Sequence, residues 1–400
     1  MEMITVQQAE DLILSETQDF GNESIFYENA LGRVLAEDLS ADRDLPPFDR
    51  PTVDGIAILY DAYEKGQRSF SVKAVQSAGE PSISIDSEGQ CIEIMTGAAL
   101  DHSVDTVVRY EDISIQNGIA TINTDINKGQ NIHLKGKDKK EGAILVKANQ
   151  VISPAIIGIA ASVGKTTLSV KRLPKIVIIS TGDEMVSAEA SPGPFQLRRS
   201  NAITISSALQ KYGVQADSLH LNDDYEEIRK EVSRCIHEYD VLLMSGGVSM
   251  GKFDYLPAVC EELGIKKRFH KIKQRPGKPF WFGKSEDKKL IFAFPGNPVS
   301  VFMCLHRYFI PWLEKSLKIP ENPCQWAVLH NDIEFSPPLQ YFAQVKLRVN
   351  DLGQLTAESV NTNGSGDFSH LADTDAFIEL PLEQNIFKKG DVYKIWRYNL

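Results

Sequence analysis

The stretch from Lys175 to about Leu317 constrains the fold most, because short apolar runs alternate along it with stretches of helical periodicity. The apolar runs have the length and composition of buried strands and lie at 175–180, 217–221, 241–244 and 290–294. This alternation predicts an α/β domain whose mostly parallel, doubly wound sheet is covered by helices on both faces. In such sheets ligands bind beyond the carboxyl ends of the strands.

The segments between these runs carry apolar residues at helical spacing. The first set is Ile205, Ala208, Leu209 and Tyr212, and the second is Ile228, Val232, Cys235 and Ile236. Asn201 is a candidate cap for the first helix, and Gly213 is a candidate stop. A third helix is expected to end near Gly264 and a fourth to begin near Val299.

The flanking segments have the shorter period of strands. Residues 69–132 read as short strands, with a type I′ hairpin signal at Asn117-Gly118. Near the C-terminus, Val345, Leu347 and Val349 alternate with polar residues, which predicts a small β-barrel-like domain. A chain of 400 residues is too long for one ordinary core, so several domains are expected.

Composition excludes several classes of protein. The formal net charge of −11 argues against general nucleic-acid binding, because a phosphate backbone would be repelled. The N-terminus lacks the basic and apolar segments of a secretory signal, and the longest apolar run, 154–163, is too short to span a membrane. The five cysteines are widely spaced, which is typical of reduced, buried thiols. We expect a cytoplasmic enzyme without a membrane or nucleic-acid partner.

Carboxylates follow two of the predicted strands. The first strand runs into Thr181-Gly182-Asp183-Glu184, where glycine permits a tight turn and the acids could hold a metal, although the same residues would also make an ordinary polar turn. Asp223 and Asp224 follow the second strand, and both fit capping-box patterns. Asp254 follows the third strand and could belong to the site, but it is also well placed to cap the next helix.

Two further motifs suit an anion. Glycines in Ser245-Gly246-Gly247-Val248-Ser249 let backbone N–H groups approach a phosphate, although glycine-rich turns after strands are common. In 271–278, alternation with Ile272 predicts a strand that puts Lys271, Lys273 and Arg275 on one side, suited to a polyanion. The turn Pro295-Gly-Asn-Pro298 lies at the same sheet edge and is stiff.

Taken in order, these motifs resemble the molybdopterin molybdenumtransferase family, which includes the E domain of gephyrin. The resemblance covers nearly the whole chain. Its fragments are Ala30–Asp38, Leu45-Pro-Pro-Phe-Asp49, Val53-Asp-Gly55, Ile94-Met-Thr-Gly-Ala98, Gly129-Gln-Asn-Ile132 with Asp138, Ser180–Glu184, Ser245–Ser249 with Asp254-Tyr255, Pro276-Gly-Lys-Pro279 and Pro295–Ser300.

The resemblance implies four domains and an elongated homodimer. The domains are a small mixed domain from 1–44 and 140–172, an inserted β-rich domain at 45–139, the α/β molybdopterin-binding domain at 173–318 and a C-terminal β-barrel at 319–400. The active site would lie between the α/β domain of one subunit and the β domain of the other. Asp54, Thr96 and Asp138 would then face Glu184, Asp223, Asp254 and the 271–278 cations.

The resemblance also implies magnesium-dependent transfer of molybdenum from molybdate to adenylated molybdopterin, with release of AMP. Glu184, Asp223 or Asp224, and Asp254 would hold magnesium. Residues expected to bind the pterin, its phosphates or molybdate are Thr181, Gly182, Ser245, Gly246, Gly247, Ser249, Lys271, Arg275, Lys278, Pro295, Pro298 and Ser365. The adenylyltransferase of the same pathway is an expected partner.

Three positions depart from the family pattern. Ile56 stands where an aromatic residue is usual, Lys137 replaces an acid, and no arginine lies near Gln340, which weakens an anion site there. Two alternatives stay open from the sequence. They are an adenylyltransferase-like activity, since that family shares the α/β domain, and a dimeric scaffolding role.

Overall fold

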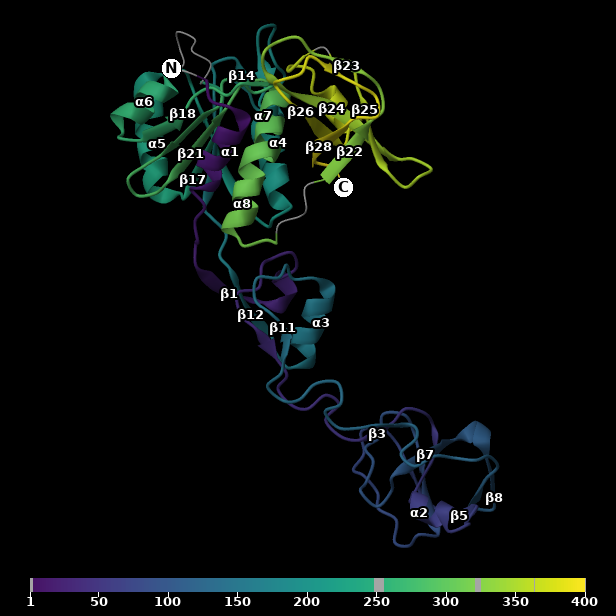
Figure 1. Ribbon diagram of the computed structural model, residues 1–400. Coiled ribbons are helices and arrows are strands. Elements are labelled where there is room, and N and C mark those ends of the chain that lie inside the picture. The colour runs from purple at the N-terminus through teal and green to yellow at the C-terminus, as the bar shows by residue number, and fades with distance from the viewer. Residues whose placement is uncertain (1–2, 248–254, 321–324, 363, 400) are drawn as a thin grey trace.

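The computed structural model describes residues 3–247, 255–320, 325–362 and 364–399. The chain is elongated (Figure 1). The α/β domain and the C-terminal barrel lie side by side at one end, a small domain follows, and the β-rich domain occupies the other end. The chain leaves the α/β region, reaches the far end and returns through the small domain (Figure 1).

The α/β domain contains a six-stranded sheet in the order β16-β13-β17-β21-β20-β18. The first four strands are mutually parallel, and β20 runs antiparallel to its neighbours. The strands are β13 (Ile176–Thr181), β16 (Ala216–Leu221), β17 (Val241–Ser245), β18 (Lys266–Phe269), β20 (Trp281–Lys284) and β21 (Leu290–Phe294). Short parallel strands β14 (Met185–Val186) and β15 (Leu197–Arg198) pair beside it.

Helices cover both faces of this sheet, as predicted. They are α4 (Ser200–Gln210), α5 (Tyr225–Glu238), α6 (Leu256–Glu262), α7 (Pro298–Cys304), the π-helical turn η3 (Leu305–Phe309) and α8 (Ile310–Ser316). Ile178 packs in one core with Ile205 of α4, whereas Ile179 packs in the other with Ile228 of α5. Successive side chains of a strand point to opposite faces, so β13 contributes to both cores.

Two details of the helices bear on the predictions. Gly213 adopts φ +73° just beyond α4, which confirms its role as a stop. The prediction that Asn201 caps α4 is wrong, because Arg199 is the N-cap and Asn201 is a buried residue inside the helix. Helix α1 (Val6–Leu14) shares the core of the α/β domain, where Ile13 is fully buried.

The C-terminal domain is a closed barrel. Strands β24, β25, β22, β28 and β26 follow one another, and β26 pairs back onto β24. The strands are β22 (Gln325–Leu329), β23 (Ile333–Glu334), β24 (Gln340–Val349), β25 (Leu355–Ser359), β26 (Ala376–Leu380), β27 (Ile386–Phe387) and β28 (Val392–Arg397), with the 3₁₀ turn η4 (Ser369–Ala372). Strand β19 (Gln274–Arg275) of the basic segment joins β24 in parallel.

The β-rich domain contains a six-stranded sheet in the order β7-β4-β6-β5-β9-β8. Its elements are β3 (Arg50–Pro51), β4 (Gly55–Ile58), α2 (Tyr60–Glu64), β5 (Ser69–Gln76), β6 (Gln90–Ile94), β7 (Thr106–Arg109), η2 (Tyr110–Asp112), β8 (Ile113–Gln116), β9 (Ile119–Ile122) and β10 (Ile132–His133). Asn117 and Gly118 both have positive φ between β8 and β9, which confirms the predicted hairpin.

The small domain is built from two passes of the chain. Strand β1 (Asn22–Phe26) pairs with β12 (Thr167–Lys171), and β2 (Leu39–Ser40) pairs with β11 (Ile144–Val146). The turn η1 (Tyr27–Asn29) and helix α3 (Pro154–Ser162) complete it. Among the described residues, none of the helices is long and apolar enough to cross a membrane.

Candidate functional site

The turn after β13 carries the first acidic motif. Gly182 has φ +129°, and a Cβ at this position would lie 2.6 Å from Glu184 Oε2. Only glycine therefore allows the Glu184 carboxylate to fold back over the turn. Thr181, just before it, is nearly buried. The turn thus places Glu184 at the carboxyl edge of the sheet, as the motif predicts.

The turn after β16 brings a second pair of acids to this edge. The backbone N–H of Asp223 donates to Asp183 Oδ1 at 3.0 Å, so the two turns are joined. Asp224 is the N-cap of α5, and its Oδ1 accepts from the Glu227 N–H at 2.8 Å. No group of three or more potential metal ligands occurs among the described residues, and Asp254 lies outside them.

The glycine turn after β17 packs against the first motif. Gly246 and Gly247 have φ +98° and +70°, and a Cβ on either would lie about 3 Å from Thr181 Oγ1, at 3.0 and 3.1 Å. Side chains are excluded there, so this turn can offer only backbone groups to a ligand. The Gly246 N–H already donates to the Phe294 carbonyl at 3.4 Å, so the Gly247 N–H is the better candidate donor. Ser249 lies outside the described residues.

A row of polar side chains lies beneath α4. Ser180 is in register with His220 on one side and with Ser245 on the other. His220 Nδ1 lies 3.0 Å from Ser180 Oγ, and burial is the main cause that lowers the pKa of His220. Asn201 Nδ2 donates to Ser245 Oγ at 2.9 Å and to the Gly296 carbonyl at 2.8 Å.

Asn201 therefore joins the last residue of β17 to the turn that follows β21. Sequence reasoning missed this role because an asparagine near a helix start also fits a cap. Its near-complete burial is the signal that separates the two roles, and burial of a single polar residue is not visible in a sequence.

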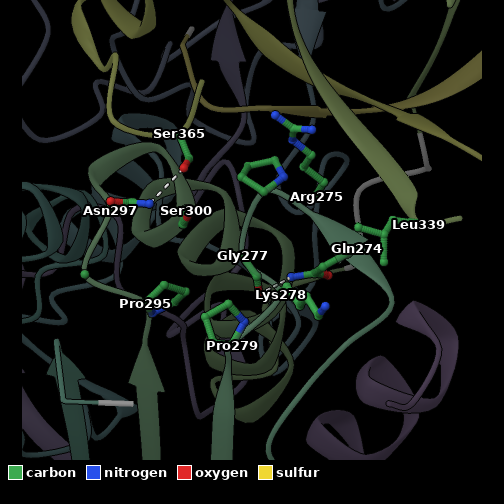
Figure 2. A pocket seen from close by; sticks show the side chains of 12 residues that line it. Gln274, Arg275, Gly277, Lys278, Pro279, Pro295, Asn297, Ser300, Leu339 and Ser365 are labelled. Carbon is green, nitrogen blue, oxygen red and sulfur yellow. Dashed lines mark hydrogen bonds between the residues drawn. The ribbon is translucent and has the colours of Figure 1, made fainter. Parts of the chain in front are cut away.

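A cavity of about 320 Å³ opens between the α/β domain and the barrel (Figure 2). It brings together Arg275 and Lys278 of the basic segment, Pro295 of the stiff turn and Ser365, together with Asn297 and Ser300. Pro298 begins α7 and lies between Asn297 and Ser300, which both line the cavity. The cavity thus unites four of the predicted site residues with Asn297 and Ser300, which lie in the 295–300 motif but were not predicted to be site residues.

The basic segment has the predicted alternation. Ile272 and Gln274 are fully buried, whereas Lys271 and Lys273 on the other side are partly exposed and Arg275 is exposed. The Arg275 guanidinium lies 5.9 Å from the centre of the Phe335 ring, on the barrel side.

The barrel contributes Ser365 to the cavity. Asn297 Nδ2 donates to Ser365 Oγ at 2.9 Å (Figure 2). The Val299 N–H donates to the Ser365 carbonyl at 3.2 Å. These bonds fix the Ser365 loop against the turn before α7. Gln340 is not in the cavity lining and instead donates to Glu379 at 2.5 Å.

The remaining predicted residues lie in the β-rich domain. Asp54 accepts two hydrogen bonds from Thr96, and Asp138 Oδ1 lies 2.9 Å from His133 Nε2. This domain and the α/β domain are at opposite ends of the chain (Figure 1). Within one chain, the acids of the β-rich domain therefore do not meet the cavity.

Sequence comparison identifies all of the main regions. Residues 4–164 match the MoeA N-terminal region (domains I and II), residues 177–315 match a probable molybdopterin-binding domain, and residues 327–398 match the MoeA C-terminal region (domain IV). A Synechocystis protein called molybdopterin molybdenumtransferase is 38% identical over 99% of this chain and 100% of its own length. A Bacillus subtilis protein of the same name is 30% identical over 93% and 89%.

A solved structure agrees with these matches. The crystal structure of the molybdopterin biosynthesis MoeA protein from Pyrococcus horikosii superposes with a TM-score of 0.86 at 27% identity, and covers 99% of both chains. The similarity therefore extends over the whole described architecture.

Proposed function

Because this chain belongs to the MoeA family of molybdopterin molybdenumtransferases, we propose that it inserts molybdenum into molybdopterin, with molybdate and adenylated molybdopterin as substrates and AMP as a product. Relatives of nearly equal length carry the name of this transferase. Neither the adenylyltransferase-like alternative nor a scaffolding role is favoured by them.

The observation that carries the proposal is the cavity beside the basic segment. Arg275 and Lys278 supply two positive charges, and Ser300 and Ser365 supply hydroxyl groups. A small oxyanion needs this combination, because cations neutralise its charge and directed donors hold its oxygens. A volume of about 320 Å³ is ample for molybdate and part of a phosphate. Lys271 would add to the positive potential.

We assign the pterin phosphates to the neighbouring turns. The backbone N–H of Gly247 would donate to a phosphate, and that of Gly246 would do so only by leaving the Phe294 carbonyl, to which it donates at 3.4 Å. Thr181, Gly182 and Ser245 would line the approach. Ser249 belongs to this proposed set but lies outside the described residues. Pro295 and Pro298 would keep the facing turn stiff.

Magnesium suits the acidic rim. It takes few protein ligands when a substrate supplies phosphate oxygens, and Glu184 and Asp223 lie on turns that share this edge. These two, with Asp254, would hold it, while Asp224 would contribute less because it caps α5. The ion would neutralise charge on the phosphoanhydride as that bond is cleaved.

We further propose a homodimer that completes the site. Asp54, Thr96 and Asp138 lie far from the cavity of their own chain (Figure 1), so the β-rich domain of a second copy would have to bring them there. A cytoplasmic location and contact with the adenylyltransferase of the same pathway stay predictions.

The direct test is turnover by the purified protein. With molybdate, magnesium and adenylated molybdopterin, we expect consumption of the pterin and stoichiometric AMP. Lys278→Gln should raise the KM for molybdate about tenfold, a loss of roughly 1.4 kcal/mol. Lys230→Gln, an exposed cation on α5, is the matched control. Absence of turnover beside an active relative would refute the function.

A further inference from the structure

The turn that carries Arg275 and Lys278 is closed on itself. The Ile272 N–H donates to the Lys278 carbonyl at 3.0 Å, and Gly277 at its tip has φ +84°. A Cβ on Gly277 would lie 2.6 Å from Cys304 Sγ and 2.9 Å from Gln274 Nε2. The tip is therefore pressed against the core without room for a side chain.

A buried amide holds this tip from below. Gln274 is fully buried, and its Nε2 donates to the Gly277 carbonyl at 2.9 Å (Figure 2). The same nitrogen lies 3.5 Å from Cys304 Sγ. Its Oε1 accepts a short hydrogen bond from the hydroxyl of Tyr308, which lies on η3 and is 1% exposed. Tyr308, Gln274 and the Gly277 carbonyl thus form one chain of hydrogen bonds.

Apolar side chains surround the hydrogen bonds of Tyr308 and Gln274. Phe280, Met303 and Phe309 belong to the same core, where polar side chains add little stability over apolar ones of equal volume and are costly if one partner is missing. A hydrogen-bonded pair does, however, specify one geometry, because amide and phenol groups bond only in defined directions. The geometry specified here is that of the Gly277 carbonyl, between the two cavity cations.

We propose that Gln274 and Tyr308 are positioning residues for oxyanion binding. By fixing the Gly277 carbonyl they set where Arg275 and Lys278 enter the cavity. Gln274 borders the cavity, but both ends of its amide are bonded to protein groups, and Tyr308 is not in the lining. The inference rests on the proposed function, since it takes molybdate as the anion. The competing role is purely structural, in which the pair only satisfies its own polar atoms within the core.

Three variants separate these roles. Gln274→Met and Tyr308→Phe each remove one partner, and the double variant replaces both with apolar groups of similar shape. Calorimetric titration with molybdate, the KM and kcat for molybdate, and the thermal midpoint are measured for each. Tyr212→Phe is the matched control. The Tyr212 phenol is also largely buried, and it donates to Glu314 at 2.8 Å, but it does not line the cavity.

Gln274→Met should raise both Kd and KM for molybdate about tenfold and change kcat less than threefold. The double variant should recover the thermal midpoint lost in the single variants but keep the raised Kd, because the Gly277 carbonyl has still lost its donor. If a single variant fails to fold, the double variant still allows the Kd for molybdate to be measured. Tyr212→Phe should lower the thermal midpoint without changing Kd.

A double variant that binds molybdate within twofold of the wild type would overturn this inference and leave the proposed function intact. A wild-type protein that binds no molybdate would overturn both.

Discussion

The Asp54 carboxylate accepts two hydrogen bonds from one residue, Thr96. The backbone N–H of Thr96 reaches Asp54 Oδ1 at 2.6 Å and its hydroxyl reaches the same oxygen at 2.7 Å. The strands behind them are adjacent, since Gly55 of β4 pairs with Ile94 of β6. These bonds lower the pKa of Asp54 below its ordinary value of 3.8, and the backbone hydrogen bond has the larger effect.

Thr96→Val should therefore raise the pKa of Asp54, because the hydroxyl bond is lost while the backbone bond remains. A lowered pKa in the folded protein favours folding above pH 3.8, and this contribution disappears as the pH falls through the folded-state pKa. Carboxylate titration by NMR measures the change. Thr121→Val, which removes a hydroxyl bonded to Ser69 in the same domain, should leave the Asp54 pKa unchanged. An unshifted Asp54 in Thr96→Val would contradict the assignment.

Asp224 allows its capping role to be separated from a role in metal binding. Asparagine caps helices as well as aspartate does but carries no charge, so Asp224→Asn should keep the stability of the α/β domain, whereas Asp224→Ala should lose about 1 kcal/mol. Because we assign magnesium to Glu184 and Asp223, the magnesium concentration for half-maximal turnover should rise in Asp223→Asn and stay constant in Asp224→Asn. If the magnesium concentration for half-maximal turnover rose in Asp224→Asn, the Asp224 carboxylate would have to be counted among the magnesium ligands.

Substitution of Asn201 should affect both the stability of the α/β domain and ligand binding in the cavity. Asn201→Asp replaces the amide donor by an acceptor that faces the Gly296 carbonyl, so we expect a loss of about 2 kcal/mol in urea unfolding. Since Gly296 lines the cavity, molybdate binding should weaken as well. Asn222→Asp alters an exposed amide bonded to Glu227 and is the control. Equal stability of both variants would show that the Asn201 amide does not hold β17 and the turn after β21 together.

The regular elements of the α/β domain were predictable because they depend on short-range periodicity. Strand β13 and helix α5 follow from apolar spacing within a few residues, and the Asn117-Gly118 turn follows from two residues alone. The sheet edge then follows from topology, since parallel strands end together. The turns that carry Glu184, Asp223 and Gly246 lie at this edge for this reason, whereas Asp254 lies outside the described residues.

The cavity was not predictable in the same way, because its residues meet only through tertiary packing. Ser365 meets Asn297 from 68 positions away, and Tyr308 meets Gln274 from 34 positions away. Neither pair has a spacing that marks contact. Resemblance to a family supplied Ser365, but it could not supply Gln274, whose importance rests on complete burial.

The half-buried imidazole of His306 makes the stability of the α/β domain depend on pH. Its Nδ1 lies 2.9 Å from the Phe302 carbonyl, and its ring centre lies 4.3 Å from that of Phe302. Burial is the main cause that lowers the pKa of His306 from 6.5 to about 4. The unfolded chain therefore binds a proton that the folded chain does not, and stability is lost as the pH falls from 6.5 toward 4. Allowing for the partial exposure of the ring, this loss should amount to about 1 kcal/mol between roughly pH 7 and pH 5. His306→Phe keeps the ring and binds no proton, so its urea midpoint should change less than that of the wild type over this interval. Parallel midpoints for the two proteins would show that His306 is not the group that titrates.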